Sequence, residues 1–176
     1  MSSVKKDYVK PILVLMLICL VISAALAITN QKTAPVIAET ERANAEAAQK
    51  EVLPKADSFT HMELSGLPTS VTAVYKADNG AGFVLKLTAK GYGGDMTLIC
   101  GMDANGLITS CKTLTQSETQ GLGSKTTQPK FKDQFVGKDS SLSGVETISG
   151  ATISSKAYIG AIKDAFTAYE IAKGAA

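Results

Sequence analysis

The sequence has few of the residues that build catalytic and metal sites. It contains one histidine, His61, and no tryptophan. A single histidine excludes a metal site built on two or more histidines, and a Ser-His-Asp triad could be built only around His61. The three cysteines form no C-x-x-C motif, which argues against a zinc ribbon, a thioredoxin-like motif and a cysteine-ligated iron–sulfur cluster. We therefore expect no metal site and no catalytic residue.

The chain also has no excess of positive charge beyond its first residues. Arg42 is the single arginine, and from residue 30 onward 15 basic side chains face 15 acidic ones. A neutral domain of this kind argues against a nucleic-acid-binding protein. Hydrophobic residues make up 45% of the chain and charged residues 19%, so the chain can bury a core.

The N-terminal part contains one long apolar run. Residues 11–28 carry no charge, and a helix of that length spans roughly 27 Å, close to the hydrocarbon core of a bilayer. We predict a transmembrane helix over residues 11–29. Because three lysines precede it, the positive-inside rule puts residues 1–10 in the cytoplasm and the main domain outside. The alternative is a signal peptide cleaved after Ala25-Leu26-Ala27, but the apolar run is longer than is usual for one.

A helical stalk is predicted over residues 30–56. Thr33 can begin a helix, the following segment is rich in Ala, Glu and Lys, and Pro54 ends it. The remaining residues, 57–176, are predicted to form one extracytoplasmic domain.

That domain is predicted to be α+β. Four short β-branched segments are separated by glycine-containing turns short enough for an antiparallel meander, namely 70–77, 81–89, 95–102 and 106–114. Residues 115–128 read as a loop, 129–136 as a short helix and 153–172 as a long amphipathic helix. We expect the helices to pack on the sheet.

Two cysteines flank the last predicted turn. With a turn centred on Ala104-Asn105, Cys100 faces Thr109 and lies diagonal to Cys111. Diagonal neighbours are ~7–8 Å apart, which is long for a disulfide. We therefore favour two buried thiols over a bonded pair.

The segment Ser149-Gly150-Ala151-Thr152 leads directly into the long C-terminal helix. Small residues let a ligand approach the backbone, and the start of a helix offers free N–H groups and a positive dipole end that suit a phosphate. The alternative is that Ser149 or Thr152 only caps the helix.

Three segments resemble a known family. The stretch VETISGATISSKA (145–157) resembles the flavinylation motif of the FMN-binding domain family, which includes the G subunit of the ion-translocating Rnf complex and the C subunit of the sodium-pumping NADH:quinone reductase. SETQGLGSK (117–125) and GYGGDMTLICGMDANGLITSCKTL (91–114) resemble the Rnf protein in the same order. The apolar N-terminal run and the short length fit that protein too.

The resemblance implies a covalent FMN on Thr152, joined through a phosphoester by a flavin transferase that uses FAD. It implies that Ser149, Gly150 and Ala151 lie against the phosphate and ribityl chain. The loop residues that the family places at the flavin match Glu118, Thr119, Gly121, Leu122 and Gly123 here. Tyr92 could approach the ring, but we favour a strand-end aromatic in the core.

The implied function is electron relay in a membrane complex that couples electron transfer between ferredoxin and NAD to Na⁺ or H⁺ export. The chain would be a redox subunit of a translocase, with the other Rnf subunits as partners, because it lacks a nucleotide-binding motif of its own. The alternatives are a stand-alone membrane-anchored flavoprotein, the C subunit of the quinone reductase, and a structural module without flavin.

Overall fold

The computed structural model describes residues 2–175, except for the side chains of residues 2–8, Ala38 and Glu41. The chain divides into two compact units, Met1–Asn44 and Ala45–Ala176. Each is described by itself.

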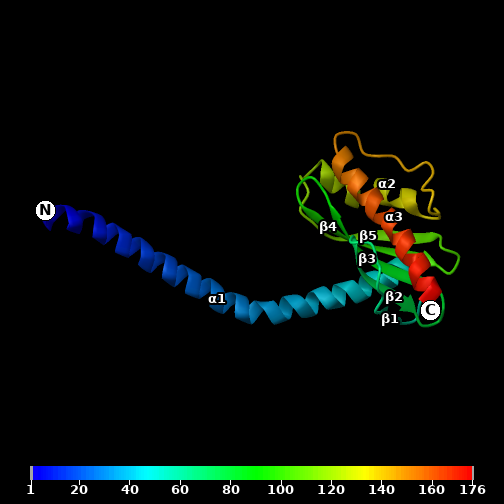
Figure 1. Cartoon of the computed structure of the whole chain (residues 1–176), viewed down its shortest axis with the longest axis horizontal. Helices are drawn as coiled ribbons and strands as arrows, with labels where there is room; N and C mark the ends of the chain where they lie inside the picture. The colour runs from blue at the N-terminus through cyan, green and yellow to red at the C-terminus, as the bar shows by residue number, and fades with distance from the viewer. Residues whose placement is uncertain (1, 176) are drawn as a thin grey trace. The chain divides into compact units, whose positions relative to one another are not determined.

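Helix α1, Ser2–Val52, occupies the first unit and continues into the second (Figure 1). The large apolar side chains from Val9 to Ile28 are all exposed. Such a surface is suited to lipid rather than water, and the helix is long and apolar enough to cross a membrane.

The predicted start of a separate helix at Thr33 is wrong. The helix runs through this position, and the Thr33 hydroxyl donates to the carbonyl of Thr29 at 2.9 Å. Thr29 in turn donates to Ala25. A threonine that bonds back to the carbonyl one turn earlier is accommodated inside a helix and does not cap a new one. Residues 33–52 are helical, as expected.

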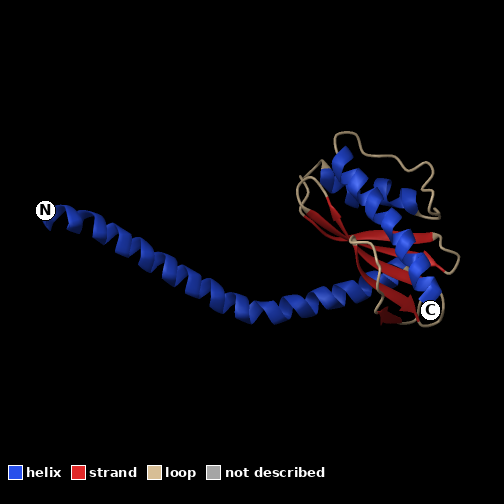
Figure 2. Cartoon of the chain, in the orientation of Figure 1, coloured by secondary structure: helices blue, strands red, loops and turns tan. Residues whose placement is uncertain are grey.

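The second unit contains a five-stranded antiparallel sheet in the order β1-β2-β3-β4-β5 (Figure 2). Its strands are β1 Phe59–Met62, β2 Val71–Ala77, β3 Gly82–Lys90, β4 Asp95–Asp103 and β5 Ile108–Gln116. The meander and the α+β class are confirmed. Strand β1 was not predicted.

The sheet buries both faces. Along β3, Phe83, Leu85 and Leu87 join the core on one face, whereas Val84 joins Val52 and its neighbours on the other. This alternation follows from the period of two in a strand. The first face is covered by helix α3, Thr152–Ala175, and the second by the C-terminal end of α1 (Figure 1).

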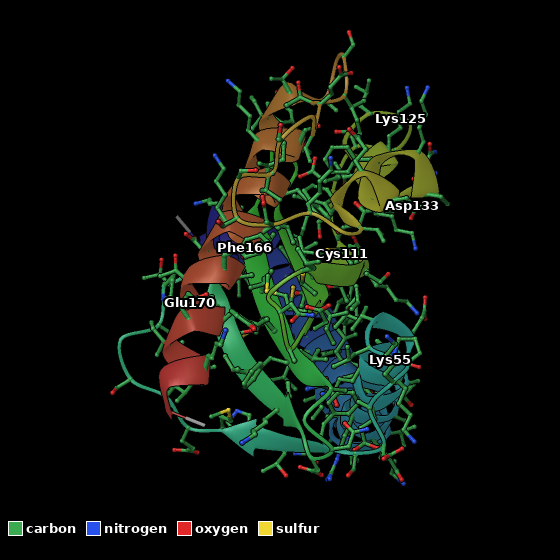
Figure 3. The ribbon with its side chains drawn as sticks, turned by 90° about the vertical axis from the view of Figure 1, so that its right-hand side faces the viewer. Lys55, Cys111, Lys125, Asp133, Phe166 and Glu170 are labelled. Carbon is green, nitrogen blue, oxygen red and sulfur yellow. The ribbon has the colours of Figure 1, made fainter. Side chains whose placement is uncertain are left out.

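Helix α3 packs through an apolar stripe. Its buried residues include Tyr158, Ile162, Ala165, Phe166 and Tyr169. Phe166 and Glu170 are labelled on this helix in Figure 3, and Glu170 is exposed. The connection from the sheet to α3 contains three short helices: η1 Gly123–Thr127, α2 Pro129–Lys132 and η2 Asp133–Phe135. The predicted single helix over 129–136 is therefore two shorter pieces.

The predicted register of the last hairpin is also wrong. Cys100 pairs directly with Cys111, not with Thr109. The turn is longer than assumed, because the Asp103 N–H donates to the Leu107 carbonyl. A register shift between Gly101 and its neighbour then adds a second residue to β5. A turn residue and a bulge residue are each invisible to alternation alone, and together they bring the cysteines opposite each other.

Candidate functional site

The site begins where α3 begins. Gly150 has a φ of +79°, a left-handed conformation that favours glycine. The chain then turns through a hydrogen bond from the Ala151 N–H to the Ile148 carbonyl at 3.0 Å. The first helical bond runs from Ser155 to the Ala151 carbonyl at 2.9 Å. The loop therefore delivers Thr152 as the first residue of the helix.

Backbone N–H groups at this helix start are free. Within the described chain, the N–H groups of Thr152, Ile153 and Ser154 donate to no protein acceptor. Three unpaired donors at the positive end of a 24-residue helix make a binding site for an anion such as a phosphate.

The Thr152 hydroxyl is available for chemistry. Thr152 is exposed, and neither its hydroxyl nor that of Ser149 makes a hydrogen bond among residues 2–175. Ser155 instead satisfies this turn: its hydroxyl donates to the Ala151 carbonyl and accepts the Ile148 N–H at 3.1 Å. Among the described residues, no hydrogen bond therefore supports a capping role for Ser149 or Thr152.

Glu118 forms the opposite wall. It is 8% exposed; its Oε2 accepts the Ser154 hydroxyl at 2.7 Å and its Oε1 accepts the Gly93 N–H at 3.3 Å. The carboxylate fills space that glycines leave open. A Cβ at Gly91 would lie 1.8 Å from Oε1, and a Cβ at Gly123 would lie 2.1 Å from Oε2. One side chain therefore joins the turn before β4, the loop after β5 and the start of α3.

These segments enclose a pocket of about 440 Å³, within the range of small-molecule sites. Seven of the nine predicted site residues line it: Glu118, Thr119, Leu122, Gly123, Gly150, Ala151 and Thr152. Two do not. Ser149 lines a neighbouring hollow of about 580 Å³, and Gly121 lies in the turn of the loop.

Apolar side chains surround the pocket. Tyr92, Leu122 and Ile153 line it and are respectively 73%, 46% and 58% exposed. The interpretation of Tyr92 as a core aromatic is therefore wrong, because the glycine-rich turn carries its ring out of the sheet. Exposed apolar surface gathered at a pocket indicates a ligand or partner that covers it.

Sequence comparisons assign the chain to a family. Residues 91–167 match the FMN-binding domain. The chain is 33% identical to the G subunit of the ion-translocating oxidoreductase complex of Methanosarcina acetivorans, over 91% of this chain and 93% of that protein. The chain belongs to the G-subunit family of ion-translocating oxidoreductase complexes.

Other relatives carry related names. The chain is 30% identical to the G subunit of the Na(+)-translocating ferredoxin:NAD(+) oxidoreductase complex of Acetobacterium woodii, over 90% of this chain and 89% of that protein. A solved structure of the C subunit of Na(+)-translocating NADH-quinone reductase from Parabacteroides distasonis is 25% identical, with a TM-score of 0.47 over 57% of this chain and 60% of that one.

The described residues of this G-subunit chain fit FMN at the pocket. The free N–H groups of α3 suit the phosphate, the small side chains of Gly150 and Ala151 leave room beside it, and the apolar residues suit the flavin ring.

Sequence reasoning missed two lining residues, Ser154 and Ile153. Both follow Thr152 on the helix, and their residue types do not distinguish them from ordinary helical positions. The one available signal was their place in the first turn of the predicted helix, beside Thr152.

Proposed function

We propose that this chain is the electron-transfer flavoprotein subunit of an ion-translocating ferredoxin:NAD⁺ oxidoreductase complex, with FMN held covalently on Thr152. The observation that carries the proposal is the exposed, unbonded Thr152 hydroxyl beside three free N–H groups at the mouth of an apolar-lined pocket. FMN supplies one- and two-electron redox chemistry when bound, and the protein supplies its position.

Attachment requires a flavin transferase and FAD. The Thr152 oxygen attacks the phosphorus of the FMN half of FAD, so that an Oγ1–P bond forms and the pyrophosphate bond breaks. AMP leaves, and the hydroxyl proton passes to a base on the transferase. The exposure of Thr152 supports this step, because the transferase must reach the hydroxyl. The phosphodiester that results keeps one negative charge.

The start of α3 stabilises that charge. The helix dipole contributes roughly 0.3–1 kcal/mol at an exposed helix terminus, and more where the group is partly buried. The N–H groups of Thr152, Ile153 and Ser154 add hydrogen-bond donors. Gly150 and Ala151 let the phosphate lie against the backbone.

The remaining residues position the ring. Leu122 and Tyr92 offer apolar faces, and Thr119 offers a hydroxyl for the polar edge. Glu118 acts indirectly: its carboxylate holds the loop against Ser154 and the turn that carries Tyr92.

The membrane arrangement is part of the proposal. The apolar segment of α1 anchors the chain, Lys5, Lys6 and Lys10 keep the N-terminus in the cytoplasm, and the FMN domain lies outside. Its partners are the other subunits of the complex. An impermeant maleimide on intact cells should label a Ser65→Cys variant but not a Ser3→Cys variant. The reverse pattern would overturn the orientation.

Covalent flavin is tested by coexpressing the full chain with a flavin transferase and examining denatured gel bands for flavin fluorescence. The wild type and Thr152→Ser should fluoresce, since both carry a hydroxyl at this position. Thr152→Val, which replaces the hydroxyl with a methyl group, should be dark. Thr147→Val is the matched control in the same segment and should fluoresce. A dark wild-type band beside an active transferase would overturn the proposal.

A further inference from the structure

The β4–β5 hairpin carries two cysteines as direct partners. Cys100 and Cys111 lie opposite each other in the ladder, and their Sγ atoms are 3.3 Å apart. Both are free thiols and at most 1% exposed. Cys111 is labelled on β5 in Figure 3.

This geometry suits a bond between the two sulfurs. Directly opposed residues of antiparallel strands have Cα atoms about 4.5–5.5 Å apart, inside the range of about 4.4–6.8 Å found for disulfides. The sulfurs need to approach by roughly 1.3 Å to reach the bonded distance of about 2.05 Å. Rotation of the two side chains supplies such a shift without movement of the strands.

We propose that Cys100 and Cys111 form a disulfide that ties β4 to β5. The oxidant is a second disulfide, carried by a small molecule or a thiol-oxidising protein. One cysteine thiolate attacks this disulfide and releases one thiol. The other cysteine then attacks the mixed disulfide, forms the Cys100–Cys111 bond and releases the second thiol. Two electrons pass to the oxidant, and the two cysteines lose two protons.

The buried position determines when the bond can form. A mixed disulfide has no room in the closed core, because both cysteines are packed beneath the helices. Burial and the neighbouring Cys100 also raise the pKa of the Cys111 thiol well above its usual range, so the folded domain holds little of the attacking thiolate. The hairpin must therefore be oxidised before the core closes, and the folded domain then keeps that redox state.

The bond would act on the flavin site through β5. This strand ends at Gln116, and Glu118 follows two residues later. Fixing β5 to β4 restrains the start of the loop that lines the pocket. The disulfide does not depend on Thr152, so it can be tested separately from the flavin.

Refolding provides the test. The full chain with Cys19→Ala, which leaves only this cysteine pair, is unfolded in detergent with denaturant and refolded with either oxidised glutathione or a reductant. Free thiols are blocked in denaturant, and the protein is digested with trypsin. Residues 91–112 form one tryptic peptide that contains both cysteines. After oxidative refolding this peptide should carry no blocking group and should be two hydrogens lighter than the reduced peptide.

The controls separate the outcomes. A Cys100→Ser variant should give a blocked thiol or a glutathione adduct, but no internal bond. The oxidised protein should melt about 10 °C above the reduced protein, as expected for a bridge that closes a loop of roughly 12 residues. Thr152→Val should behave like the parent. Blocked thiols or glutathione adducts in the parent peptide after oxidative refolding would overturn the proposal.

Discussion

The role of Glu118 can be tested through the glycine that faces it. In Glu118→Ala the Ser154 hydroxyl and the Gly93 N–H lose a charged acceptor. Hydrogen bonds to charged groups contribute about 1.5–3 kcal/mol each, and the 3.3 Å bond is the weaker one. We expect a loss of about 3 kcal/mol in the free energy of unfolding, which lowers the melting temperature by roughly 10 °C.

Gly91→Ala should lower the free energy of unfolding by a similar amount, because it also removes the hydrogen bonds of Glu118. Its Cβ would lie 1.8 Å from the Glu118 Oε1, so the carboxylate must leave and lose its hydrogen bonds. Without Glu118, the nearest remaining atom is the Gly94 carbonyl oxygen at 3.2 Å. In the Glu118→Ala background, Gly91→Ala should therefore cost only about 0.5 kcal/mol, a coupling of roughly 2.5 kcal/mol between the two positions.

Calorimetry of the full chain in detergent measures all four proteins of this cycle. Gly101→Ala is the control, because its Cβ would lie 2.4 Å from the Val52 carbonyl on the other face of the sheet. Its cost should be the same with and without Glu118. If Gly91→Ala lowers the free energy of unfolding as much in the Glu118→Ala background as in the wild type, the Glu118 carboxylate does not fill the space beside Gly91.

Three further predictions concern stability. Burial, as the largest cause, raises the pKa values of the Cys111 thiol and the Tyr158 hydroxyl. The reduced domain should keep the stabilisation from both groups below pH ~8.5. It should lose the Cys111 contribution above pH ~8.5 and the Tyr158 contribution above pH ~10, because the unfolded chain ionises first. Hydrogen bonds from Ser58 and Thr60 lower the pKa of Asp78, so stability should fall as pH drops below ~4, and less steeply in Asp78→Asn. Gly160→Ala on α3 meets no atom within 4 Å and should stabilise by about 0.5–1 kcal/mol.

Thermal melts check each prediction. A melting temperature that stays level from pH 7 to pH 10 under reducing conditions would contradict the alkaline prediction. A melting temperature that falls equally steeply below pH ~4 in the wild type and in Asp78→Asn would contradict the prediction for Asp78. A Gly160→Ala variant that melts below the wild type would show that the space beside the helix is filled.

Most of the fold could be predicted from the alternation of apolar residues in strands and their periodicity in helices. Strands β2 to β5 and the stripe of α3 follow from the spacing of their apolar residues. Strand β1 was not predicted, because its four residues, Phe59–Met62, are too few to show an alternating apolar pattern. The register at Cys100 was wrong because a longer turn and a bulge each add a residue, and neither leaves a mark in the hydrophobic pattern.

The part of the site that could be predicted is the part formed by residues close together in the sequence. The segment that ends at Thr152 is continuous, so its place at the start of a helix could be read directly. The pairing of Glu118 with Ser154 joins residues 36 positions apart, and no local pattern reports such a contact. Tyr92 was misassigned because glycine-rich turns do not reveal which way a ring projects.

Mass spectrometry of one tryptic peptide can show whether FMN is bound to Thr152. Residues 139–156 form a single peptide that contains Thr152 together with seven other hydroxyl side chains. After coexpression of the full chain with a flavin transferase, this peptide should gain the mass of FMN less one water. Fragmentation should locate the added mass on Thr152. An unmodified peptide, or a flavin on any other hydroxyl of this segment, would contradict attachment of FMN to Thr152.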